Sequence, residues 1–173
     1  MKKEGMGRKY LPEFVYGGVD GAVTTFAVVS GVMGAALSPA IVLILGFANL
    51  IADGFSMATS DYLSVKSEND LDRHRRKNAK KIALATFLSF VVMGAVPLIP
   101  FVAAAITKSE YFVENQFIHS IILTALALIF VGWHKGEVVG KHKVFSSLQT
   151  LTIGGTAAVL AFLVGFFIKS LIG

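Results

Sequence analysis

The chain lacks cysteine altogether and is poor in charged residues. None of its 173 residues is a cysteine, so it can form neither a disulfide nor a thiolate metal site. Only 16% of the residues are aspartate, glutamate, lysine or arginine, whereas soluble domains contain about 25%. The hydrophobic share is 54% and the mean hydropathy is +0.69. These values exclude an ordinary soluble domain and predict an integral membrane protein.

The charged residues are concentrated in connections between apolar segments, each of which is long enough to cross a bilayer as a helix. We expect an all-α fold in which residues 1–173 form a single transmembrane domain. Although the net charge is +5, the basic residues lie in loops, so we expect no nucleic-acid partner. The five predicted transmembrane helices span residues 14–36, 39–65, 82–107, 117–134 and 148–172.

The distribution of basic residues predicts the orientation in the membrane. Four lysines or arginines precede the first segment, and the successive connections contain none, seven, one and three. Because basic loops stay on the cytoplasmic side, we expect a cytoplasmic N-terminus and a C-terminus on the opposite side. The basic connection at residues 66–81 should then be a cytoplasmic loop that contacts anionic membrane lipid.

The second segment carries polar groups through its middle. Residues 46–68 read GFANLIADGFSMATSDYLSVKSE. At about 100° per residue, one sector of roughly 140° holds Asn49, Asp53, Ser56, Met57, Ser60, Asp61 and Ser64. A carboxylate in hydrocarbon costs about 2.5–3.5 kcal/mol and usually faces a polar interior. This pattern indicates a helix that lines a cation route.

The first segment supplies a second polar face. Asp20, Thr24, Gly31 and Gly34 fall on one side of its helix, and the glycines would let another helix approach closely. Asp20 lies roughly 9 Å from the cytoplasmic end of its helix, and Met57 lies about 12 Å from the same end of the antiparallel second helix. We therefore expect the two residues to share a site.

The residue types at this site favour a divalent transition metal. Carboxylate and amide oxygens suit hard cations, and a thioether adds a soft ligand, so Fe²⁺ or Mn²⁺ is the expected substrate and no resident cofactor is predicted. Carboxylates also bind protons, which would permit metal–proton exchange. The candidate ligands are Asp20 and Met57, followed by Asn49 and Asp53, with Asp61 and Glu68 at the cytoplasmic entrance.

Two other functions are compatible with the residues alone. The chain could be a membrane scaffold or dimerisation protein that does not transport. Asp20 and Asp53 could instead form an intramembrane aspartyl dyad, which requires two close carboxylates that share a proton. Their contexts, VDGA and ADGF, do not resemble known intramembrane aspartyl proteases, so we predict that the protein is not an enzyme.

Two stretches of the chain resemble the vacuolar iron transporter family. They are DGAVTTFAVVSGVMGA in the first segment and GFANLIADGFSMATSDYLSVKSE in the second. The resemblance implies a homodimer, in a cell or vacuole-like membrane, that exports Fe²⁺ or Mn²⁺ from the cytosol in exchange for protons. It also implies that the first helices meet at the dimer interface and that Asp20 and Met57 match the membrane metal site of the family. The chain departs from the pattern twice, because Asn49 replaces a family glutamate and the short loop 66–81 replaces a cytoplasmic metal-binding domain.

Overall fold

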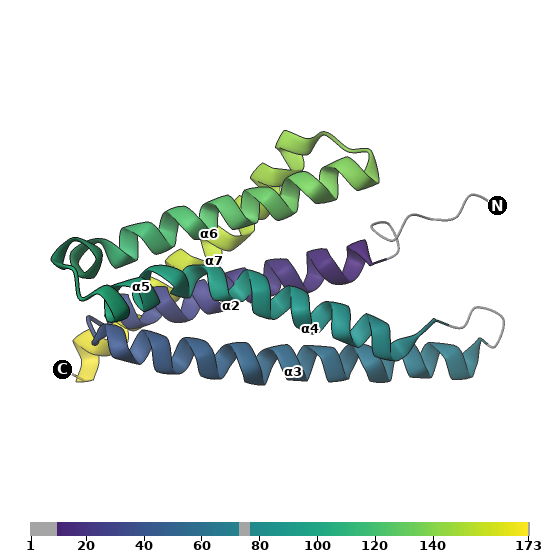
Figure 1. Cartoon of the computed structure of the whole chain (residues 1–173), viewed down its shortest axis with the longest axis horizontal. Coiled ribbons are helices and arrows are strands. Elements are labelled where there is room, and N and C mark those ends of the chain that lie inside the picture. The colour runs from purple at the N-terminus through teal and green to yellow at the C-terminus, as the bar shows by residue number, and fades with distance from the viewer. Residues whose placement is uncertain (1–9, 73–76, 173) are drawn as a thin grey trace.

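The structure is a computed structural model that describes residues 10–72 and 77–172. Helices joined by short connections make up these two ranges, and the described residues contain no β-strand. The elements in chain order are α2 (Leu11–Gly34), α3 (Pro39–Leu71), α4 (Ala79–Ala95), the 3₁₀ turn η1 (Val96–Leu98), α5 (Ile99–Thr107), α6 (Glu110–Val139) and α7 (Lys143–Ile172). Figure 1 shows them as one elongated bundle.

Five helical spans are long and apolar enough to cross a membrane, which confirms the predicted all-α membrane fold. The third span is composite, because α4, η1 and α5 together run from Ala79 to Thr107. Most of the helices are longer than the apolar segments that predict them. The fourth was expected at 117–134 but covers Glu110–Val139, because the helix continues through charged turns at both ends, where it can leave the hydrocarbon.

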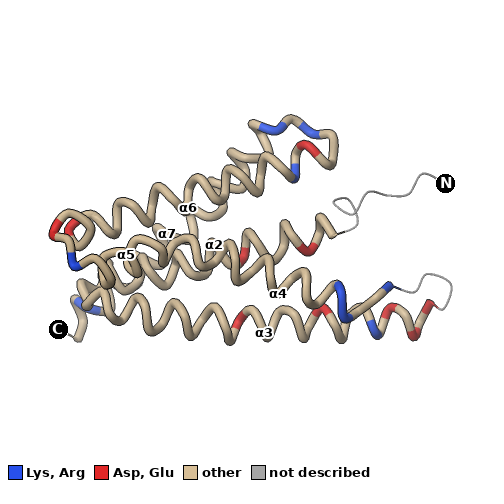
Figure 2. The backbone as a smooth tube through the Cα atoms, in the orientation of Figure 1, with Lys and Arg blue, Asp and Glu red and all other residues tan. Residues whose placement is uncertain are grey.

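The connections divide between the two ends of the bundle (Figure 1). The start of α2 and the α3–α4 and α6–α7 connections lie at one end, whereas the α2–α3 and α5–α6 connections and the end of α7 lie at the other. In Figure 2, basic positions are more frequent at the first end. Residues 1–9 and 73–76, which carry much of the basic charge used for orientation, lie outside the described residues, so the orientation stays a prediction.

Helix α2 is the central element of the bundle. Half of the residues in the apolar, membrane-spanning part of α2 are buried inside the bundle, whereas only 11% of those in the corresponding part of α7 are buried. A Cβ atom on Gly17 would lie 2.6 Å from the carbonyl oxygen of Thr86, and one on Gly21 would meet the backbone of Phe90. Only glycine permits this close approach to α4. Gly34, on the face predicted to pack closely, meets the backbone of Phe162 on α7, and Gly31 contacts Ala161 of the same helix. The predicted close packing of α2 therefore exists, and its partners at these glycines are helices of the same chain.

The break between α4 and α5 follows from Pro97, which has no N–H to continue an α-helix. Ser120 of α6 donates a hydrogen bond to the carbonyl oxygen of Pro97 at 2.7 Å. Its hydroxyl is completely buried. A neighbouring helix thus satisfies a backbone group at the break, as a kinked helix in a membrane requires.

Candidate functional site

The acidic residues of the bundle interior lie on α2 and α3, and the middle parts of the other helices carry none (Figure 2). Gly21 follows Asp20 on α2, and Gly54 follows Asp53 on α3. Both glycines pack against Phe90 of α4, Gly21 against its backbone and Gly54 against its ring. Asp20 and Asp53 therefore lie at depths that differ by less than about one helical turn.

Asp20 is half-buried. Among the described residues, its carboxylate forms neither a hydrogen bond nor an ion pair, and the nearby Thr24 hydroxyl donates instead to the Asp20 backbone carbonyl at 2.7 Å. The carboxylate borders a cavity of about 470 Å³ between α2, α6 and α7. Its lining consists of Val15, Tyr16, Val19, Asp20, Val23, Lys135, Gln149, Thr150 and Ile153. The lining contains one acid, Asp20, and one base, Lys135, and no residue of α3 contributes to it.

The three candidate ligands in the middle of α3 are all half-buried. Met57 packs against the largest apolar cluster of the core. It follows Asp53 by four residues, or about one helical turn, along α3. The side-chain nitrogen of Asn49 is buried without a hydrogen-bond partner. Asn49, Asp53 and Met57 thus follow one another at successive turns, at or near the depth of Asp20.

The two residues predicted at the entrance are engaged elsewhere. The hydroxyl of Thr86, which is fully buried on α4, donates a hydrogen bond to the Asp61 carboxylate. Glu68 is exposed and forms an ion pair with Lys77 at 2.9 Å. Thr86 also packs through its carbonyl oxygen against Gly17, less than one turn before Asp20, so Asp61 contacts α4 where α4 meets α2, whereas Glu68 pairs with a lysine that follows the end of α3.

Sequence reasoning missed Glu13. One of its carboxylate oxygens is buried without a hydrogen-bond partner. Glu13 precedes Asp20 by seven residues, or almost two turns, which places both on the same side of α2. The spacing of these two acids along one face was the signal that could have found it.

The predicted polar sector of α3 divides in the folded chain. Met57 and Asp61 turn toward the other helices of the bundle. The side chains of Ser56, Ser60 and Ser64 remain exposed. A membrane helix that presents hydroxyls and small side chains outward has a surface suited to another helix rather than to lipid.

The ligand set within one chain is incomplete for a metal. The described residues contain no group of three or more histidine, cysteine, aspartate or glutamate side chains that could hold an ion. Asp20 and Asp53 supply carboxylate oxygens, and Met57 supplies a thioether. Water, backbone carbonyls, the Asn49 amide or a second chain would have to supply the remaining ligands.

The chain is similar to several proteins named for vacuolar iron transport. A "Vacuolar iron transporter homolog 1" from Arabidopsis thaliana is 33% identical over 95% of this chain and 84% of its own length. A "Vacuolar iron transporter homolog 4" from the same plant is 32% identical over 87% of this chain and 79% of its own. A "Vacuolar iron transporter" from Toxoplasma gondii is 25% identical over 95% of this chain and 76% of its own.

The aligned lengths show that at least one relative is longer than this chain within the matched region. The match to the Toxoplasma protein extends over 231 positions, more than the 173 residues present here, so that relative carries additional residues within the aligned region. The sequence model of the VIT family matches in two parts, residues 11–82 and 71–166. The two matches overlap at residues 71–82, a range that includes the α3–α4 connection, where the family resemblance places a cytoplasmic metal-binding domain. Since the two matches cover most of the chain, from the start of α2 into α7, the protein belongs to the VIT family.

Proposed function

We propose that the protein transports divalent transition-metal ions, Fe²⁺ or Mn²⁺, out of the cytosol in exchange for protons. The observation that carries the proposal is the pair of half-buried carboxylates, Asp20 and Asp53, at a common depth inside the bundle and within a turn of Met57. Carboxylates inside a membrane mark ion or proton pathways. Relatives named vacuolar iron transporter, or homolog of it, support iron as a substrate.

The charge of the pair suggests how exchange could work. Two ionised carboxylates carry a charge of −2, which one divalent cation or two protons would neutralise. Binding of one divalent cation or of two protons removes the repulsion between Asp20 and Asp53. The ionised pair without a bound cation is unfavourable in a medium of low polarity. Alternation between a metal-loaded and a protonated state therefore needs no other titrating group.

We further propose that the working unit is a homodimer. Exposed small side chains recur every four residues along α3, at Ala48, Ala52, Ser56, Ser60 and Ser64. This stripe adjoins the half-buried Asn49 and Asp53, so a second chain packed there would close the site and could add ligands. Small residues are the common contact surface between membrane helices.

Because the chain has no cysteine, single-cysteine variants can test the dimer directly. Ser56→Cys, Ser60→Cys and Ser64→Cys should form disulfide-linked dimers in native membranes. Leu88→Cys, at an exposed position of α4, is the matched control and should remain monomeric. If none of the three serine positions cross-links more than the control, this dimer interface is wrong.

Flux in proteoliposomes tests the transport itself. With an acidic lumen, we expect Fe²⁺ and Mn²⁺ to accumulate inside while the lumen becomes more alkaline, and Co²⁺ and Zn²⁺ to enter more slowly. Vesicles without protein provide the control for leakage. If no divalent metal moves at any imposed pH gradient, transport is excluded and the scaffold function becomes the better explanation.

A further inference from the structure

A groove between α3 and α4 lies outside the candidate metal site. Its volume is about 370 Å³, and it is lined by Phe55, Ala58, Thr59, Tyr62, Lys80, Ala83, Leu84 and Phe87. Ala58 and Ala83 are the smallest of these side chains and leave a depression between the larger ones. The walls are open to the surroundings, since Phe55 is 68% exposed and Leu84 is 56% exposed. In a membrane, this groove faces lipid.

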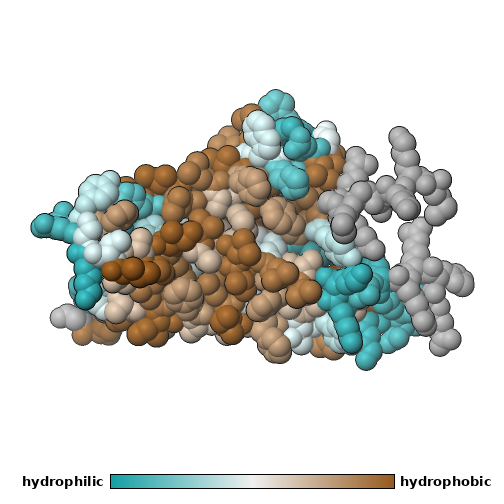
Figure 3. Space-filling model, in the orientation of Figure 1, coloured by the Kyte–Doolittle hydropathy of each residue, from teal (hydrophilic) through white to brown (hydrophobic). Residues whose placement is uncertain are grey.

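One end of the groove is positively charged. Lys80 is the second residue of α4 and is exposed, and among the described residues it forms no ion pair. Its aliphatic stem can follow the apolar groove while its ammonium group reaches the polar boundary of the bilayer. Figure 3 shows hydrophilic surface at this end of the molecule directly beside the hydrophobic surface of the bundle.

The surrounding charges favour an anion at this position. The described residues of this connection include four lysines, Lys66, Lys77, Lys80 and Lys81, and three acids, Glu68, Asp70 and Asp72. One of these acids, Glu68, is paired with Lys77 at 2.9 Å. An anionic headgroup in the groove would therefore meet the ammonium group of Lys80, with Lys81 next to it in the sequence, and this attraction decays within about 10 Å at 0.1 M salt.

We propose that this groove is a binding site for an anionic phospholipid of the leaflet that borders the 66–81 loop. One acyl chain lies over Ala58 and Ala83, between the Phe55 side and the Leu84–Phe87 side, and the phosphate contacts Lys80. A second copy of the chain fits this groove less well, because the exposed small residues of α3, Ser56 and Ser60, are not among its lining.

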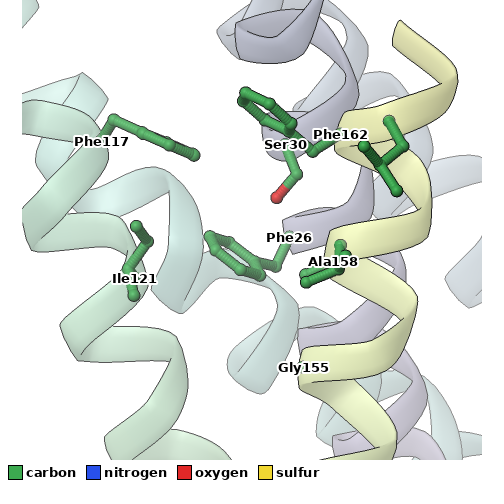
Figure 4. A pocket seen from close by; sticks show the side chains of 9 residues that line it. Phe26, Ser30, Phe117, Ile121, Gly155, Ala158 and Phe162 are labelled. Atoms are coloured by element: carbon green, nitrogen blue, oxygen red, sulfur yellow. The ribbon is translucent and has the colours of Figure 1, made fainter. Parts of the chain in front are cut away.

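A second apolar pocket provides an internal comparison. It lies between α2, α6 and α7, has a volume of about 320 Å³, and is lined by Phe26, Ser30, Phe117, Ile121, Gly155, Ala158, Val159, Phe162 and Leu163. Figure 4 shows the aromatic side chains around this pocket, and the Ser30 hydroxyl is the one polar side-chain atom among the lining residues drawn. Since no charged residue lines this pocket, a chain bound there should not select a headgroup.

The proposal can be tested by counting lipids retained on the purified protein in native mass spectrometry. Phosphatidylglycerol and phosphatidylcholine with identical acyl chains should be offered at equal concentration. We expect one phosphatidylglycerol per chain to survive mild activation. Lys80→Gln should weaken its retention about fivefold, the factor expected for one lysine near an anionic surface. Lys81→Gln is the matched control and should change little, because Lys81 is exposed on the same helix but does not line the groove.

A second variant tests the apolar half of the site. Ala83→Leu fills the depression and should reduce retention of phosphatidylglycerol even with Lys80 present, while circular dichroism confirms the helical fold. Equal retention of the two lipids by the native protein would overturn the proposal. An equal loss in the Lys80 and Lys81 variants would also overturn it, because it would mean diffuse attraction to the basic loop rather than a site.

Discussion

At the scale of single residues, the acidic side chains of α2 and α3 fall into two kinds. Asp61 and Glu68 already have partners, a buried hydroxyl and a lysine. Asp20 and Asp53 have neither a hydrogen bond nor an ion pair among the described residues, and both are half-buried. Ionised groups in such a position are costly unless a counter-ion is present. Asp20 and Asp53 are therefore the acids most in need of a bound cation or proton.

Asp20→Asn should abolish transport of every divalent metal. The substitution preserves the shape of the side chain and removes the charge that any divalent cation would contact. Initial flux into proteoliposomes, at matched protein incorporation, is the measurement. Asp70→Asn changes an exposed acid near the end of α3 and should leave flux unaltered. Normal flux in the Asp20 variant would remove the proposed central site.

Met57→Leu should weaken Fe²⁺ transport more than Mn²⁺ transport. The thioether matters more for the softer ion, whereas leucine nearly preserves the volume packed against the core, so the free energy of unfolding should change by less than about 1.5 kcal/mol. The ratio of Fe²⁺ to Mn²⁺ flux should be compared between the variant and the native protein. An equal loss for both metals would mean that Met57 shapes the site without coordinating through sulfur.

At the scale of elements, the close contact of α2 with α4 positions the site. Phe90 packs on Gly21 with its backbone and on Gly54 with its ring. A single residue of α4 therefore fixes how deep in the membrane α2 and α3 place their aspartates relative to each other. Thr86, one turn earlier on α4, binds Asp61 through its hydroxyl and packs on Gly17 through its carbonyl. Helix α4 therefore acts as the spacer between the two helices that carry the candidate ligands.

Gly21→Leu should separate α2 from α4 and destabilise the protein by about 1–3 kcal/mol, because an added side chain meets the backbone of Phe90 and cannot be accommodated by a rotamer change. Thermal unfolding in detergent, followed by circular dichroism, would measure the effect. Gly155→Leu is the control, since a Cβ atom there has no other atom within 4 Å. Equal stability of the two variants would contradict the close packing.

At the scale of the whole molecule, the ends of the bundle differ in charge and in their connections. The α6–α7 connection lies at the same end as the start of α2, and the α5–α6 connection lies at the other (Figure 1). Orientation in the membrane decides which end receives metal from the cytosol. It follows from the loop charges rather than from the packing of the helices.

Cysteine labelling can determine this orientation. Lys141→Cys and Lys108→Cys place single thiols in the α6–α7 and α5–α6 connections, where both native side chains are exposed. We expect an impermeant maleimide to label position 141 only from the cytoplasmic side and position 108 only from the opposite side. The reverse pattern would mean that the loop charges mislead and that the proposed direction of export is inverted.

The sequence by itself determined the number and type of the membrane helices and the presence of acids on the first two. Apolar length and low charge require membrane-spanning helices, and helical periodicity sets the angular position of each residue on its own helix. Only the tertiary structure decided which neighbour each face meets. Periodicity places Met57, Asp61 and Ser60 in one sector, but the approach of α4 turns the first two inward and leaves Ser60 exposed. The use of Gly17 and Gly21 of α2 against α4 also depends on that approach, because contacts between helices are set by packing across the bundle and not by spacing along one helix.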